Sequence, residues 1–169
     1  MNNIIRNIIR ALALLLFQIL VLNNVYLGGY ITPFFYVLFL LMLPSNTPKM
    51  LMLAIGFVSG FTIDIFSNML GFHTFAATLI TFCRITFADK ILTRGEAVTI
   101  EIPSIRSVAI APALYYLFLL FFIYNFAYYA LISFSFGDIL QILFSSLMST
   151  LAVWILAILY QVLFLKKND

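Results

Sequence analysis

The chain is built from long apolar runs that are separated by short polar connections. A helix needs about 20 apolar residues to cross the hydrocarbon core of a bilayer. Each run is therefore a candidate for one transmembrane helix. Six such helices are expected, over about residues 7–25, 28–43, 50–66, 71–88, 108–132 and 139–165.

The composition excludes the other common classes of protein. Hydrophobic residues make up 64% of the 169 residues and charged residues only 9%, against about 45–50% and about 25% in an average soluble domain. Too few polar residues remain to cover a soluble fold, and the same hydrophobicity excludes disorder. A single cysteine, Cys83, excludes a disulfide scaffold. The expected fold class is an all-α integral membrane protein, with one six-helix domain over residues 1–169.

The second apolar run, Ile31–Leu43, is the shortest. It contains Pro33 near its start, and Pro44 follows its end. As a helix it would be about 20 Å long, against a hydrocarbon core of about 30 Å. To cross, the run must borrow residues from Tyr26–Tyr30 or thin the bilayer; otherwise it is partly re-entrant.

The basic residues predict the orientation. With the N-terminus inside, all nine Lys and Arg residues of a six-span chain fall on the inner side, as the positive-inside rule requires. They are Arg6, Arg10, Lys49, Arg84, Lys90, Arg94, Arg106, Lys166 and Lys167. The outer side keeps only the acidic residues Asp64 and Asp138. We therefore expect both termini in the cytoplasm, and Arg84 as an interface anchor that snorkels inward from the fourth helix.

One connection, Asp89–Ser107, is longer and hydrophilic, yet too short to form a soluble catalytic domain. Asp89–Arg94 would suit an interfacial helix. Val98–Ile102 alternates with period two, which would suit strand pairing with a partner. A loop that follows the membrane surface is favoured over such pairing.

Polar groups inside the membrane are costly and therefore informative. Asp64 lies near the outer end of the third helix, and His73, the only histidine, opens the fourth. A helical hairpin would bring the two side chains to the same depth, where a hydrogen bond between them would lock the hairpin. Binding of a partner at the outer face is the second hypothesis. A proton relay or metal site is the third, because one histidine, one aspartate and the distant Cys83 make a poor ligand set.

Small and polar residues also mark two helix faces. Gly56 and Gly60 are four apart in the third helix, so another helix can approach closely there. Packing within the chain is favoured over packing against a partner. In the sixth helix Gln141, Ser145 and Ser149 share one face, which we expect to point into the bundle; hydrogen bonding between helices is favoured over the lining of a small-molecule cavity.

No sequence motif indicates an enzyme. The chain has no G-x-S-x-G elbow, phosphate-binding loop or metal-spaced Cys/His cluster. It also has no basic soluble face that would suit nucleic acid. We therefore expect neither a reaction nor a cofactor.

The hairpin nevertheless carries a recognisable pattern. Gly60-Phe61-Thr62-Ile63-Asp64-Ile65-Phe66-Ser67, followed by Gly71-Phe72-His73, resembles the signature of the rod shape-determining MreD family. The family pattern is G-x-x-x-D-x-[FL]-S, a short gap and then G-x-H. The resemblance extends from Gln18 to Arg84, whereas the chain from Glu96 onward is generic apolar sequence. Thr74-Phe75 departs from the smaller residue pair that the family pattern leads us to expect after the histidine.

The resemblance implies a role in cell shape. MreD proteins work with MreC, a single-span membrane protein, in the elongation machinery that directs lateral peptidoglycan synthesis together with RodA and a class B penicillin-binding protein. The fold resembles the substrate-binding components of energy-coupling-factor vitamin transporters, and such a component is the alternative function. Under the first hypothesis, the partner-binding or hairpin-locking residues are Gly56, Gly60, Asp64, Gly71 and His73, and the location is the bacterial inner membrane.

Overall fold

The protein forms a bundle of α-helices. The computed structural model describes residues 3–24, 31–44, 46–69, 71–92, 110–133 and 138–164, with side chains for all of these except 3–6, 24 and 88–92. Within that part of the chain there are six α-helices and one 3-10 turn: α1 (Asn3–Leu20), η1 (Leu22–Asn24), α2 (Val37–Leu41), α3 (Lys49–Ser67), α4 (Phe72–Leu92), α5 (Ile110–Ser133) and α6 (Ile139–Phe164).

Three of these helices, α3, α5 and α6, are long and apolar enough to cross a membrane. Two others carry shorter apolar stretches, Asn7–Leu20 in α1 and Phe72–Phe87 in α4. Large apolar side chains lie exposed on the outer faces of α1, α3 and α6, which would be unfavourable in water and suits contact with lipid. The described architecture is all-helical and compatible with an all-α membrane protein.

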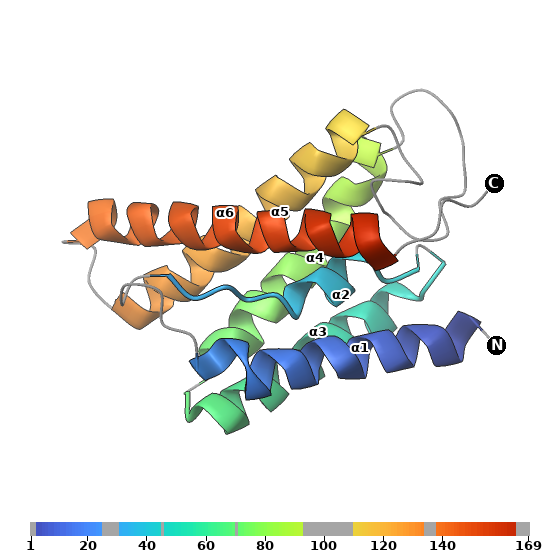
Figure 1. Ribbon diagram of the computed structural model, residues 1–169, viewed down its shortest axis with the longest axis horizontal. Coiled ribbons are helices and arrows are strands. Elements are labelled where there is room, and N and C mark those ends of the chain that lie inside the picture. The colour runs from blue at the N-terminus through green and yellow to red at the C-terminus, as the bar shows by residue number, and fades with distance from the viewer. Residues whose placement is uncertain are drawn as a thin grey trace.

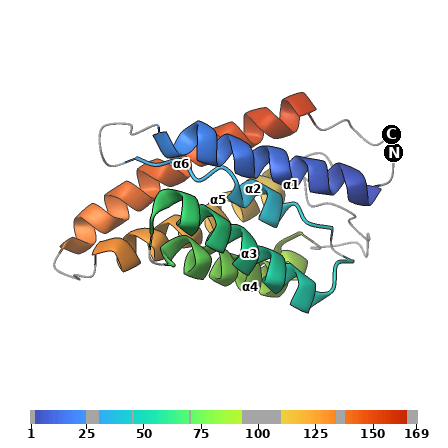
Figure 2. The ribbon, with the colours of Figure 1, turned by 90° about the horizontal axis from the view of Figure 1, so that it is seen from below.

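Successive helices pack against each other along the second half of the chain. α3 contacts α4, α4 contacts α5, and α5 contacts α6, while α1 lies against α3. Figure 1 shows that the start of α1, the start of α3 and the end of α6 lie at the same end of the bundle. In Figure 2, α2 lies between α1 and the α3–α4 pair, and it contacts α5 as well.

Five of the six expected spans correspond to helices, but the second does not. The segment expected as a helix over about 28–43 is α-helical only at Val37–Leu41, and Thr32–Phe34 have no regular structure. Residues 25–30 lie outside the described part of the chain. The helix expected from Asp89 is a continuation of α4 as far as Leu92. The rest of the Asp89–Ser107 loop, with its possible strand, also lies outside the described residues.

The second run is helical over only part of its length. Thr32–Phe34 have no regular structure, and Phe35 and Tyr36 form a turn that leads into α2, with Tyr36 at the helical angles φ −58° and ψ −26°. We call residues 31–44 the central segment. Bare backbone of this kind is tolerated at membrane depth only where protein surrounds it.

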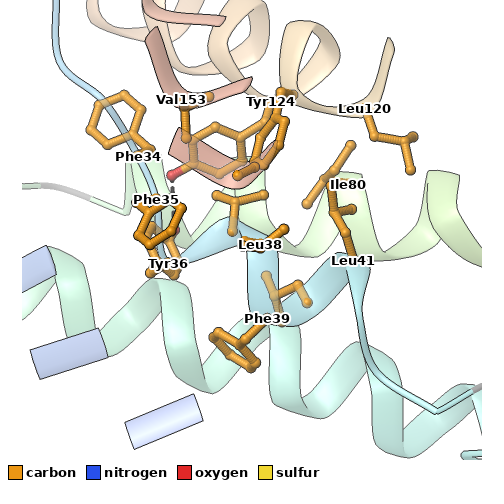
Figure 3. Close-up of a cluster of buried hydrophobic side chains, with 14 of the residues drawn as sticks. Phe34, Phe35, Tyr36, Leu38, Phe39, Leu41, Ile80, Leu120, Tyr124 and Val153 are labelled. Atoms are coloured by element: carbon orange, nitrogen blue, oxygen red, sulfur yellow. Dashed lines mark hydrogen bonds between the residues drawn. The ribbon is translucent and has the colours of Figure 1, made fainter. Parts of the chain in front are cut away.

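The central segment is indeed the core of the bundle. Every residue from Phe34 to Met42 is at most 6% exposed. Figure 3 shows side chains of this segment among Ile80 of α4, Leu120 and Tyr124 of α5, and Val153 of α6. A bundle whose centre holds a non-helical stretch and a one-turn helix thus replaces the six full-length helices expected from the sequence.

Candidate functional site

The hairpin between α3 and α4 is closed by two residues with positive φ. Asn68 (φ 53°) is the left-handed C-cap of α3, and the N–H of Met69 donates to the Asp64 carbonyl at 3.0 Å. Gly71 (φ +88°) precedes α4. A Cβ at Gly71 would meet no atom within 4 Å, so glycine is favoured there by the backbone angle and not by a lack of space.

The Asp64 side chain caps α4 from the neighbouring helix. Its Oδ1 accepts the backbone N–H of His73 at 3.0 Å, and its Oδ2 accepts the N–H of Thr74 at 2.8 Å and the Thr74 hydroxyl at 2.5 Å. The first N–H groups of a helix have no partner inside the helix, and an anion is favourable beside them. Asp64, 3% exposed, therefore joins the two helices of the hairpin, as the hairpin-locking hypothesis expects.

The expected bond between the Asp64 carboxylate and the His73 ring is not formed. The ring Nδ1 instead lies 2.8 Å from the hydroxyl of Tyr124 on α5, and that hydroxyl lies 2.8 Å from the hydroxyl of Tyr36 in the central segment. Figure 3 shows the Tyr36–Tyr124 pair. The rings of Phe34 and Tyr128 flank the imidazole at centroid distances of 4.9 Å and 4.5 Å. His73 thus ties the hairpin to α5 and to the core.

The glycine stripe of α3 is occupied by α4. A Cβ at Gly60 would lie 2.5 Å from the His73 carbonyl oxygen and 2.6 Å from the Thr74 Cα, and a Cβ at Gly56 would collide with the Thr81 hydroxyl. This is the internal packing that was favoured from the sequence. The expectation that a partner helix docks on Gly56 and Gly60 is wrong, because α4 of the same chain fills that space.

Arg84 does not act as an interface anchor. Its side chain is 2% exposed, and it points into the bundle at the end of α2. Nε donates to the Leu41 carbonyl at 3.1 Å, Nη2 donates to the Leu43 carbonyl, and Nη1 lies 2.9 Å from the sulfur of Met52. The last carbonyls of a helix lack partners and carry negative partial charge. A guanidinium fork satisfies them, which is why the residue turns inward.

The start of the central segment is held by side chains in the same way. Gln18 Oε1 accepts the backbone N–H groups of Phe35 and Tyr36, at 2.8 Å and 3.4 Å. The N–H of Thr32 lies 3.2 Å from the hydroxyl of Ser149 and 3.3 Å from that of Tyr129. Because these residues come from α1, α5 and α6, the non-helical backbone has hydrogen-bond partners on three helices.

Gln18 and Asn23 also connect the central segment to the hairpin. The Gln18 amide nitrogen donates to Asn23 Oδ1 at 3.0 Å, and the Asn23 amide nitrogen donates to the Ser67 hydroxyl at 2.8 Å. The sequence gave no site role to Gln18, Tyr36 or Tyr124. A polar side chain in the middle of an apolar run was the available signal for Gln18.

The polar face of α6 is divided between two environments. Ser149 and Ser146 are buried, and Ser146 donates to the Ile142 carbonyl at 2.6 Å. Asn125 of α5 donates to the Thr150 hydroxyl at 3.1 Å. The Asn125–Thr150 bond joins α5 and α6, as expected of a packing face, while the Ser146 bond stays within α6. Gln141, however, is exposed and lines a hollow of about 270 Å³ together with Ser145.

The hairpin and the central segment use their buried polar side chains in the same way. Their buried polar side chains bind backbone and side chains of the same chain, so the arrangement suits holding helices in place. Among the described residues, no group of three or more His, Cys, Asp or Glu side chains could hold a metal ion. In comparisons with known proteins, no family model matches the chain, and no curated protein or solved structure matches it.

Proposed function

We propose that this chain is a membrane scaffold of the bacterial cell-elongation machinery. In this role it resides in the inner membrane with both termini in the cytoplasm and pairs with MreC, in a complex with RodA and a class B penicillin-binding protein. It thereby helps to control rod shape and lateral peptidoglycan synthesis, and it catalyses no reaction itself. The proposal starts from the MreD-like pattern of the hairpin.

The observation that carries the proposal is the spatial convergence of that pattern. Gly60, Asp64, Ser67, Gly71 and His73 are the positions that define it, and all five lie in the hairpin joint described above. Gly60 permits the close approach of α4, Asp64 caps that helix, and Ser67 accepts a hydrogen bond from Asn23. Residues that fix the positions of helices suit a scaffold, because a scaffold presents a fixed surface to its partners.

The surface for MreC has to differ from the one expected at first. Because α4 covers the glycine stripe, and because Asp64 and His73 are at most 3% exposed, a partner helix would contact the outward side chains of the bundle. The joint would then act indirectly, by fixing the helices that carry those side chains.

The alternative is a vitamin-binding transporter component. It would need a polar pocket, for which the chain offers Asn68, Asp64, His73 and the serines of α6. Asp64, His73 and Ser149 are engaged in hydrogen bonds within the chain. A stoichiometric vitamin-like molecule in the purified protein, detected by mass spectrometry, would favour this alternative.

The decisive experiment is depletion of the protein in its rod-shaped host. We expect the cells to become round, wild-type protein to restore rods, and tagged protein to co-purify with MreC. Asp64→Ala should restore shape poorly, whereas Thr62→Ala, a control on the same helix, should restore it fully. Cells that stay rod-shaped on depletion, or MreC that never co-purifies at normal membrane levels, would overturn the proposal.

A further inference from the structure

A hollow of about 270 Å³ lies between the end of α5 and the start of α6. Three polar side chains line it from the start of α6, namely Asp138, Gln141 and Ser145. Their spacing of three and four residues places them on the same face of the helix. Tyr129 and Ser133 of α5 complete the polar lining, but both already have interactions within the protein.

The three side chains from the start of α6 keep their hydrogen-bonding capacity. Within the described part of the chain, none of them has a hydrogen bond or an ion pair. Asp138 and Gln141 are exposed, whereas Ser145 is only 4% exposed. The hollow therefore runs from an open mouth at Asp138 to a buried floor at Ser145. A buried hydroxyl without a partner is unfavourable, so its place in the wall of a hollow points to a bound group that completes it.

The hollow is an acceptor site with a negative charge. A carboxylate can only accept hydrogen bonds, and the amide oxygen and the hydroxyl beside it accept as well. None of its lining residues is basic. Lys49 begins α3 and Arg10 lies in the first half of α1, both toward the other end of the bundle (Figure 1), and Arg84 is bound at the end of α2. The hollow suits a cation that donates several hydrogen bonds.

The arrangement of the acceptors selects the kind of cation. Mg²⁺ and Ca²⁺ take about six or more oxygen ligands, and the lining contains a single carboxylate. Neighbouring members of the set are offset by about 5 Å along the axis of α6, at about 1.5 Å per residue. A guanidinium has N–H groups that point in several directions within one plane, so it can donate to two such acceptors at once. An ammonium is a compact and strongly hydrated point charge.

We propose that the hollow binds a guanidinium group. The inner N–H groups donate to the Gln141 amide oxygen and the Ser145 hydroxyl, and the N–H on the side of the stem donates to the Asp138 carboxylate. Ile142, which is buried in the wall of the hollow, supplies an apolar surface for the plane of the group. The guanidinium belongs either to a small molecule or to an arginine side chain of another protein.

The test uses the full-length protein in detergent with ¹³C-labelled isoleucine methyl groups, titrated with a short peptide that carries one arginine. The Ile142 methyl resonance, assigned through Ile142→Val, should shift, and that of Ile80 in the core should stay. The arginine peptide should bind about two- to fivefold more tightly than the same peptide with citrulline, which lacks the charge; this is the range for one partly exposed ion pair. A lysine peptide should bind less tightly than the arginine peptide.

Variants of the lining test each contact. Asp138→Asn should make the arginine and citrulline peptides equal, Asp138→Glu should keep their difference, and Ser145→Ala should weaken arginine binding. A carboxylate at the start of a helix also stabilises that helix, so the peptide comparison and not stability is the readout. Asn46→Ala, an exposed change at the opposite end of the bundle (Figure 1), is the control. Circular dichroism verifies that each variant is folded.

Three outcomes would overturn the proposal: equal binding of the arginine and citrulline peptides to the wild-type protein, equal binding of the arginine and lysine peptides, or an arginine preference that survives in Asp138→Asn. Ethylguanidinium separates the two sources of the group. A shift of the Ile142 methyl resonance with ethylguanidinium, lost in Asp138→Asn, would assign the hollow to a small guanidinium compound. A response to the arginine peptide alone would assign it to an arginine side chain of another protein.

Discussion

The hairpin of α3 and α4 and the central segment solve the same problem in different ways. Both must satisfy backbone polar groups in surroundings that offer no water. In the hairpin, regular helices satisfy nearly all of them, and Asp64 supplies acceptors to N–H groups only nine and ten residues further along the chain. In the central segment the side-chain partners come from 17 to 117 residues away.

This difference shows which part of the bundle depends on contacts between residues that are far apart in the sequence. The hairpin is a local unit, specified by glycines and one carboxylate within a short stretch. The central segment depends on Gln18, Arg84 and Ser149, which belong to three different helices. The two regions meet at Tyr124, which lies within hydrogen-bonding distance of both His73 and Tyr36.

The largest effect is expected in the hairpin, from Gly60→Leu. The new side chain would collide with the backbone of His73 and Thr74, so α3 and α4 would have to separate. We expect a loss of more than about 3 kcal/mol in the free energy of unfolding, the upper range for overpacking, measured by denaturation in detergent. Ala54→Leu, on the exposed face of α3, should change little. A stable Gly60→Leu protein would contradict the close packing of the hairpin.

Arg84→Met tests the central segment in the same assay. It removes the donors to the carbonyls of Leu41 and Leu43 at a buried site. The Leu41 carbonyl keeps the Tyr116 hydroxyl at 3.4 Å, whereas the Leu43 carbonyl loses its guanidinium donor. Leaving a buried polar group without its partner costs about 1–3 kcal/mol, and we expect a total of about 3 kcal/mol. Arg84→Lys should recover only part of this, because an ammonium lacks the planar fork. Full recovery with lysine would show that charge alone matters; Arg10→Met, a half-buried position on α1, is the control.

Asp64→Ala should weaken the hairpin by about 2 kcal/mol, since loss of a helix cap costs about 0.5–2 kcal/mol and the carboxylate also binds the Thr74 hydroxyl. Amide hydrogen exchange should rise first at the start of α4, near Thr74, and remain slow in α2. Equal acceleration in both places would mean that the two regions are a single cooperative unit. Thr62→Ala is the matched control.

The smallest effect is expected at the junction of the two regions. Tyr124→Phe removes the hydroxyl between His73 and Tyr36 but keeps the ring in the core, so the loss should be about 1 kcal/mol. Tyr115→Phe, exposed on the same helix, should have no effect. In a double-mutant cycle with Arg84→Met, additive losses of stability would support two energetically independent regions. A coupling energy above about 0.5 kcal/mol would contradict that independence.

The local features of the fold could be predicted from the sequence. Apolar length predicted five helices, and the spacing of Gly56 and Gly60 indicated close packing within the chain. The hairpin role of Asp64 could also be anticipated, because its partners are near in sequence. The ring of His73 could not be assigned, since its partner Tyr124 lies 51 residues away among many other aromatic residues.

The central segment shows what apolar length cannot predict. A run with Pro33 and Pro44 was recognised as too short, but its inward burial depends on acceptors and donors that lie in other helices. The positive-inside rule treated Arg84 as a surface charge because the rule counts charge and ignores unsatisfied carbonyls. The side chain turns inward because the end of α2 offers two of them.

The non-helical start of the central segment has a consequence for biogenesis. A nascent chain that enters the membrane from its N-terminus exposes Thr32 long before Ser149 has been synthesised, since the two are 117 residues apart. The Phe35 and Tyr36 N–H groups can bind Gln18 of α1 at once, but the Thr32 N–H lacks its hydroxyl partners until α5 and α6 have been made. The start of the central segment therefore reaches its full set of hydrogen bonds only after the last described helix has joined the bundle.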